Sequence, residues 1–390
     1  MSGAAHPLRD RAAIVGVGYT EFSKNSGVST LALALRAIHA ALADAGLTHR
    51  DVDGVACHRV GDSAQAAVVA QSLGVDDLRY HLDLWGGGGT SAGVIGSAAM
   101  AVATGVAECI VCWRAVNARS EFRMGGTDRA APDTVEFQYQ VPYGYFAPPQ
   151  QFAMIARAYV DAFGVTAEDL GRVAITQRNY ARDNERAMAR SALSMDDYLA
   201  SRWVVEPLRL FDCCLETDAA VALVVTSAER ARDLKPVPVL VSGAAFGSGH
   251  TLYSNGRADF TTSAAARMAP RLYAMAGIGP DDLDVAELYD AFTPLVLLQL
   301  EDYGLCAKGD AAGLVADGAT ALGGRVPVNT HGGHLSEGYV HGLNHVAEAV
   351  AQLRGTCGSR QVPGAEVALS TGQPGYVSGA TSAVILRRAS

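Results

Sequence analysis

The segment His331-Gly-Gly-His-Leu-Ser-Glu-Gly-Tyr-Val-His-Gly-Leu-Asn-His345 is the most informative part of this chain. It holds four of the chain's ten histidines, one tyrosine and four glycines, and an alanine-rich helix is expected directly afterwards, over Val346–Arg354. Glycine takes positive φ angles at no steric cost and lets a ligand approach the backbone. Amide groups at a helix N-terminus favour negative charge. The pattern is typical of a site that moves protons around a developing anion, although a plain turn with a helix cap would contain the same glycines.

Composition predicts a large globular protein. The 390 residues suggest two similar units or one composite domain. Hydrophobic residues make up 49% of the chain, and a net charge of −9 without a basic stripe argues against nucleic-acid binding. The apolar stretch Ala92–Val116 is interrupted by Ser97, Thr104 and Glu108, so no membrane span is expected. Seven cysteines, an odd number without framework spacing, favour a reducing cytoplasm.

An anionic ligand would need local arginines. One candidate group runs from Arg114 to Arg123. The other has a spacing of four, along and just beyond an expected helix over Thr166–Met188: Arg178, Arg182, Arg186 and Arg190. Residues four apart share one helix face, and a solvated face would explain this spacing equally well.

Strands and helices alternate twice along the chain. Short apolar runs predict strands at 12–18, 52–58, 82–85, 109–113, 219–226, 239–245 and 285–289. Helical spacing predicts helices at 29–45, 94–104, 149–163 and 262–276. The first of these has Ser29 as its N-cap and Gly46 as its stop. Between 117 and 209 the alternation loosens and prolines and tyrosines accumulate, which indicates an insertion.

An internal repeat relates the two alternating parts. Ala45–Cys57 matches Ala276–Leu288 at a constant offset of 231 residues, and each piece ends a helix, crosses an acidic turn and enters a strand. Two related α/β halves are therefore expected. The predicted boundaries are 1–116 with 210–234 for the N-terminal half, 117–209 for the inserted loop region, and 235–390 for the C-terminal half.

The duplication and several motifs resemble the thiolase family, most of all its sterol-carrier-protein-type, lipid-transfer-like branch. The motifs are Glu287-Leu-Tyr-Asp-Ala-Phe, Gly338-Tyr-Val-His-Gly, Ile14-Val-Gly-Val-Gly and Thr371-Gly-Gln-Pro-Gly. The resemblance implies an α/β thiolase fold with two duplicated halves in five αβαβα layers and an inserted loop domain. It also implies a homodimer and acyl-CoA ligands, with no cofactor besides the CoA thioester of the substrate.

The chain departs from this family at its reactive groups. The position of the nucleophilic cysteine falls at about Gly88, and no cysteine lies between Cys57 and Cys109. Tyr339 stands at the family's histidine position and Tyr289 at its Asn or His position. Without a thiolate no acyl-enzyme can form.

Two tyrosines in a thioester pocket can support a retro-aldol cleavage, in which protons are moved without a covalent intermediate. An ordinary phenol pKa of about 10 would have to fall for this role. Three histidines are candidates for lowering it: His331, His334 and His341. Asp290 could orient a partner, and backbone amides near Gly88 and Gly375 are candidates for an oxyanion hole. Acid and base stay unassigned, with Tyr339 placed nearer the enolate and Tyr289 nearer the hydroxyl.

This pattern resembles the steroid side-chain aldolases of actinobacteria. The resemblance implies cleavage of a 17-hydroxy steroid acyl-CoA, namely 17-hydroxy-3-oxo-4-pregnene-20-carboxyl-CoA, to androstenedione and propionyl-CoA. It implies a small OB-fold acyl-CoA-binding partner. Such a bulky substrate needs an apolar wall, and the aromatic residues of the insertion are candidates for it, although plain packing or a partner surface would explain them equally well: Phe137, Tyr139, Tyr143, Tyr145 and Phe146.

Two rival functions stay open. One is a non-catalytic acyl-CoA or lipid carrier, and the other is an acyltransferase with Ser91 or Thr90 as its nucleophile. The clustered histidines could ligate zinc by spacing alone, but no metal is expected.

Overall fold

The computed structural model describes residues 6–123, 125, 135–234, 236–248, 258–376 and 379–389. In this part of the chain one sheet has the strand order β3-β2-β4-β7-β1-β8-β11-β10-β9. The strands are β1 (Ala12–Tyr19), β2 (Gly54–Arg59), β3 (Tyr80–Trp85), β4 (Cys109–Asn117), β7 (Asp218–Ser227), β8 (Val239–Ser248), β9 (Val285–Glu287), β10 (Val367–Thr371) and β11 (Ala380–Arg388). The expected strands are all present, with shifted ends.

The sheet repeats itself on either side of the β1–β8 pair. In the first half β1 pairs antiparallel with β7, β7 antiparallel with β4, and β4 parallel with β2. The second half has the same pattern: β8 pairs antiparallel with β11, β11 antiparallel with β10, and β10 parallel with β9. The outer edges of the two halves are also alike. Strand β3 runs parallel to β2 at one edge, and Val328 forms a parallel bridge to Ala286 of β9 at the other.

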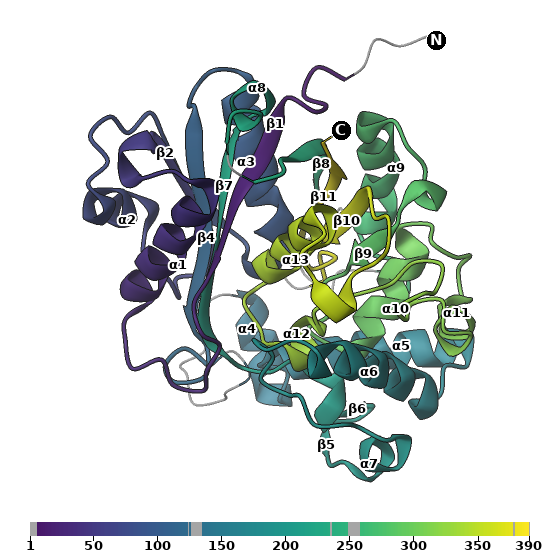
Figure 1. The fold of residues 1–390 in the computed structure, drawn as a ribbon. Coiled ribbons are helices and arrows are strands. Elements are labelled where there is room, and N and C mark those ends of the chain that lie inside the picture. Colours follow the sequence, from purple (N-terminus) through teal and green to yellow (C-terminus); the bar gives the residue numbers. More distant parts are fainter. Residues whose placement is uncertain are drawn as a thin grey trace.

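Helices complete five layers (Figure 1). The first outer layer contains α1 (Thr30–Ala45) and α2 (Ala66–Leu73), and the last contains α9 (Ala265–Ala276) and α10 (Thr293–Asp302). Between the two halves of the sheet lie α3 (Ser91–Ala103) and α13 (Leu343–Arg354), each of which contacts strands of both halves. The predicted duplicated, five-layered α/β thiolase fold is confirmed; the exact domain boundaries stay a prediction.

The repeat seen in the sequence has a local cause in both halves. Helix α1 begins at its N-cap Ser29, whose hydroxyl accepts the amide of Ala32, and ends at Gly46 with φ 71°. Helix α9 ends at Gly277 with φ 66°. A left-handed residue ends a helix most easily when it is glycine. Each helix is followed by a single 3₁₀ turn and then by β2 or β9.

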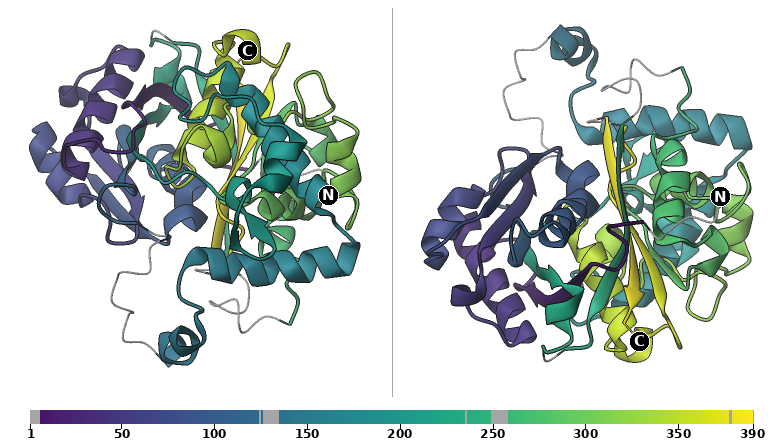
Figure 2. Two further views of the ribbon diagram at one scale, coloured as in Figure 1. Left: turned by 90° about the horizontal axis from the view of Figure 1, so that it is seen from below. Right: turned by 90° about the horizontal axis from the view of Figure 1, so that it is seen from above.

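The inserted region lies at one end of the sheets, as the view from below shows (Figure 2). It contains α4 (Val135–Gln140), α5 (Pro148–Phe163), α6 (Ala167–Arg182), α7 (Met195–Ala200) and the short pair β5 (Trp203–Val205) and β6 (Leu208–Arg209). Helix α6 packs on α10, on α11 (Ala311–Ala316) and on α12 (Gly333–Ser336).

The expectation of one helix to Met188 with four arginines on one face was wrong. Helix α6 ends at Arg182, and Arg186 turns inward to the buried carboxylates of Glu337 and Glu348. The side chain of Arg186 is thus placed by a long-range ion pair, which the spacing of arginines along the sequence cannot reveal.

Two further observations concern the described residues. None of their helices has the length and apolar character needed to cross a membrane. All seven cysteines are free thiols.

Candidate active site

Tyr289 and Tyr339 meet in the interior. Tyr289 follows β9 by two residues, and Tyr339 lies in the loop between α12 and α13. Their hydroxyl oxygens are 2.6 Å apart, and either can be the donor. Tyr289 is 2% exposed and Tyr339 9% exposed. The fold therefore unites the two phenols that the sequence placed at reactive positions.

The backbone of each tyrosine is anchored. The Tyr289 amide donates to Thr371 Oγ1 (2.9 Å), and the Tyr289 carbonyl accepts from Gln299 Nε2 (2.6 Å). Thr371 Oγ1 donates in turn to Gln299 Oε1 (2.6 Å). The Tyr339 amide donates to Thr217 Oγ1 (3.0 Å) and to the carbonyl of Leu215 (3.2 Å). These anchors fix where the two side chains start, so that the hydroxyls can meet.

Gly88 lies directly beneath the Tyr289 ring. A Cβ atom at position 88 would lie 2.2 Å from Tyr289 Oη and 2.4 Å from its Cζ. The place of a nucleophilic side chain is thus filled by the phenol. The hydroxyls of Thr90 and Ser91 donate to the carbonyls of Gly87 (2.9 Å) and Gly88 (3.1 Å), so neither rival nucleophile has a base as its hydrogen-bond acceptor.

The pKa values of the two phenols differ from the expectation. Burial raises the pKa of Tyr289 well above its usual value of 10, although the hydrogen bond with Tyr339 opposes the rise. Burial and the neighbouring Tyr289 raise the pKa of Tyr339 as well. Both groups are therefore neutral phenols at physiological pH.

The neighbouring histidines do not supply the expected positive charge. Burial and His345 lower the pKa of His334 to about 4, although its ring lies 4.8 Å from that of Tyr289 and 4.7 Å from that of Tyr339. Burial and Arg114 hold the pKa of His341 well below 6.5. Both imidazoles are neutral and act as polar neighbours.

His331 is a cation, and its ion-pair partners are the glutamates Glu287 and Glu337. Burial lowers its pKa, but the carboxylates of Glu337 and Glu287 outweigh burial and raise the pKa of His331 to about 9. His331 Nδ1 lies 3.0 Å from Glu287 Oε2. Its contact with the site passes through His345, whose ring centroid is 4.7 Å away.

Asp290 orients several partners at once. Its carboxylate accepts the amides of His334 (2.9 Å) and Leu335 (3.3 Å) at the start of α12, and lies 2.9 Å from His345 Nε2. Although burial opposes it, contacts with His334 and His345 lower the pKa of Asp290, which is ionised. Donor atoms of Asp290, His334 and His345 lie within 4.8 Å of one another, so this trio could hold a metal ion by geometry.

Arg114 is the buried cation of the site. It lies on β4, forms an ion pair with Asp62, and donates from Nε to His341 Nδ1 (2.9 Å). Guanidinium groups only donate, so His341 Nδ1 carries no proton and its proton is on Nε2. The charge of Arg114 lowers the pKa of both phenols, but less than burial raises it. The sequence had singled out Arg114 only for an anionic ligand.

Gly375 does not support the predicted oxyanion hole. Its amide donates to Gln373 Oε1 (2.7 Å), and its Cβ position faces Ala264 and the Gly379 backbone. Gly372 and Gln373 of this loop lie against Gly88: a Cβ at position 372 would be 2.8 Å from the Gly88 carbonyl oxygen, and the Gln373 amide donates to that oxygen (2.9 Å).

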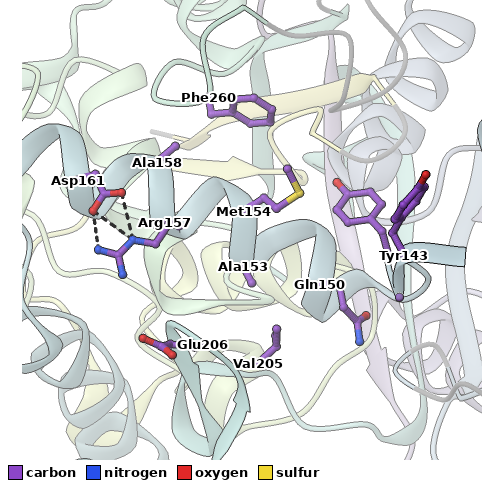
Figure 3. Close-up of a pocket in the computed structure, with 12 residues that line it drawn as sticks. Tyr143, Gln150, Ala153, Met154, Arg157, Ala158, Asp161, Val205, Glu206 and Phe260 are labelled. Carbon is purple, nitrogen blue, oxygen red and sulfur yellow. Dashed lines mark hydrogen bonds and ion pairs between the residues drawn. The ribbon is translucent and has the colours of Figure 1, made fainter. Parts of the chain in front are cut away.

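The aromatic part of the insertion borders a different hollow. Tyr143 and Tyr145 line an open groove of about 590 Å³ with Met154 of α5, Val205 of β5 and Phe260 (Figure 3). Neither catalytic candidate lines this groove. Two of the five predicted wall residues, Tyr143 and Tyr145, therefore line a groove that the phenol pair does not line.

The fold and the phenol pair together define a class: a thiolase-fold protein with a tyrosine pair in its interior and glycine at the expected place of the nucleophilic cysteine. A family model, Thiolase C-terminal domain-like, matches residues 247–388. The chain is 47% identical to a steroid side-chain-cleaving aldolase of Thermomonospora curvata, over 90% of this chain and 92% of that protein. It is 45% identical to the 17-hydroxy-3-oxo-4-pregnene-20-carboxyl-CoA lyase of Mycobacterium tuberculosis, over 97% and 100%.

A solved structure of an Ltp2-ChsH2(DUF35) aldolase has a TM-score of 0.92 and 44% identity, and the match covers 98% of each chain. The chain belongs to the thiolase superfamily, and within it to the same family as the two aldolase and lyase relatives.

Proposed function

We propose that this chain is a carbon–carbon lyase. It cleaves 17-hydroxy-3-oxo-4-pregnene-20-carboxyl-CoA by a retro-aldol reaction and releases androstenedione and propionyl-CoA. The observation that carries the mechanism is the 2.6 Å contact between the hydroxyls of Tyr289 and Tyr339. The names of the two full-length relatives support the substrate.

The two phenols act as a relay. One tyrosine oxygen takes the proton of the substrate's β-hydroxyl while its own proton passes to the second tyrosine. The second tyrosine gives its proton to the α carbon of the thioester. The O–H electron pair becomes the ketone π bond, and the pair of the broken carbon–carbon bond becomes the new C–H bond. Both tyrosines end as they began, so raised pKa values are no obstacle.

The relay runs without a cofactor. The thioester itself stabilises the enolate, and for each proton that the hydroxyl gives to the first tyrosine, the second tyrosine gives one to carbon. Arg114 contributes the nearby positive charge as the enolate develops, because a buried charge acts strongly in a low dielectric.

The assembly is a homodimer that also binds a small OB-fold acyl-CoA-binding protein. Strand β3 supports the dimer, because it is the edge of the sheet and Trp85 on it is 69% exposed. The two-component name of the solved Ltp2-ChsH2(DUF35) aldolase supports the second partner. Free thiols fit a cytoplasmic location.

A direct assay tests this function. Purified chain, with and without the small partner, is incubated with the 17-hydroxy steroid thioester, and androstenedione and propionyl-CoA are measured by mass spectrometry. Equimolar release of both supports the lyase. Tight binding of the thioester without either product, also in the presence of the partner, would instead indicate a carrier.

A further inference from the structure

Two glycines from opposite halves of the chain lie against the Tyr289 ring. Gly88 lies at the hydroxyl end, where a Cβ would come within 2.2 Å of Oη. Gly342 lies farther along the same side of the ring, where a Cβ would be 3.2 Å from Tyr289 Cδ2 and 2.7 Å from Ser91 Oγ. Gly342 also has φ 92°, which disfavours any other residue. We call Gly88 and Gly342 the glycine socket.

Hydrogen bonds hold both the Gly88 backbone and the Tyr289 residue in place, so neither can easily shift to make room for a side chain at position 88. The Gly88 carbonyl accepts the amide of Gln373 (2.9 Å) and the hydroxyl of Ser91 (3.1 Å), which fixes the backbone of Gly88. Tyr289 is held through its own amide and carbonyl, and its ring packs against His334. The clash therefore involves the body of an anchored ring and not the tip of a flexible chain.

We propose that the glycine socket positions Tyr289 for the relay, and that a side chain at position 88 and the Tyr289 phenol exclude each other. This rests on the proposed lyase function. Gly88 is a positioning residue: because it has no side chain, the Tyr289 hydroxyl can reach the Tyr339 hydroxyl. A nucleophile at this position and the phenol relay cannot operate in one site, so glycine at 88 selects proton-transfer chemistry over acyl transfer.

The first test compares Gly88→Ala with Gly313→Ala. Gly313 lies inside α11 with open space at its Cβ position, so it is a matched control. Gly88→Ala should lower kcat by roughly 100-fold, the usual cost of an ångström-scale misplacement, with KM changed little. Its residual kcat should rise with pH, because a phenol cut off from its partner must ionise to act. A Gly88→Ala enzyme with wild-type kcat would overturn the proposal.

The second test is a double-mutant cycle on thermal unfolding, which needs no turnover. Gly88→Ala should lower Tm in the wild type, but should change Tm little in a Tyr289→Ala background, where the ring is gone. Equal losses of Tm in both backgrounds would refute the socket. Because this cycle measures stability, it separates failure of the socket from failure of the proposed lyase function.

Discussion

The hydroxyl oxygens of Tyr289 and Tyr339 lie 2.6 Å apart in the interior, although the residues are fifty positions apart in the chain. Each is the other's hydrogen-bond partner, and burial keeps both neutral. Two neutral phenols in this arrangement can pass a proton along without either of them holding a full charge. Four predictions follow from this pair and from the charges around it.

Removing either hydroxyl should interrupt the relay. Tyr289→Phe and Tyr339→Phe should each lower kcat by about 10²–10⁴-fold, the usual contribution of a proton-transfer group, while KM changes little because the ring remains. Steady-state release of propionyl-CoA measures this. Tyr143→Phe is the control, since Tyr143 is 86% exposed in the outer groove and should retain full activity. Full turnover in either site variant would exclude the relay.

The rate should be independent of pH between about 6 and 8. Both phenols have pKa values raised above their usual 10, and His334 has a pKa of about 4, so none of the three titrates in this window. Measuring kcat across the window tests this. A tenfold rise in kcat per pH unit would mean that a phenolate is the base, contrary to the relay.

Exchange of the α proton of propionyl-CoA should require the ketone. In the reverse direction one phenol takes the α proton, and the proton displaced through the pair must end on the ketone oxygen. Incubation of the enzyme with propionyl-CoA in D₂O should therefore give deuterium at the α carbon only when androstenedione is present. Mass spectrometry detects the label, and rapid labelling without the ketone would contradict a coupled pair.

His331 should make the fold less stable at alkaline pH. Its pKa rises on folding from 6.5 to about 9, so its contribution is complete below about pH 6.5 and is lost as the pH rises through 9. The shift corresponds to roughly 3 kcal/mol of unfolding free energy.

Urea unfolding at pH 6.5 and 9.5 measures this loss. His331→Gln should be less stable at pH 6.5 and should show a smaller decline toward pH 9.5. His39→Gln, an exposed position on α1, should follow the wild type. An unchanged pH dependence in His331→Gln would show that the Glu287 and Glu337 carboxylates do not hold a protonated imidazole.

Several features were predictable because they depend on local pattern. Apolar runs and helical spacing gave the order of the elements, and the match between Ala45–Cys57 and Ala276–Leu288 predicted the duplication that the paired sheet halves display. Gly46 ended its helix as expected. Where a distant partner intervenes, as at Arg186, the local pattern was misleading.

The sequence by itself determined the fold family and the two tyrosines, because both depend on residue types at fixed positions along the chain. Only the tertiary structure decided how the tyrosines function. Their shared hydrogen bond, their raised pKa values, the neutral state of His334 and His341, and the nearness of Arg114 all arise from burial and from contacts between distant segments. Burial disfavours the charged form of a group because it removes the water around it. How far each of these groups is buried is decided by the packing of the two halves.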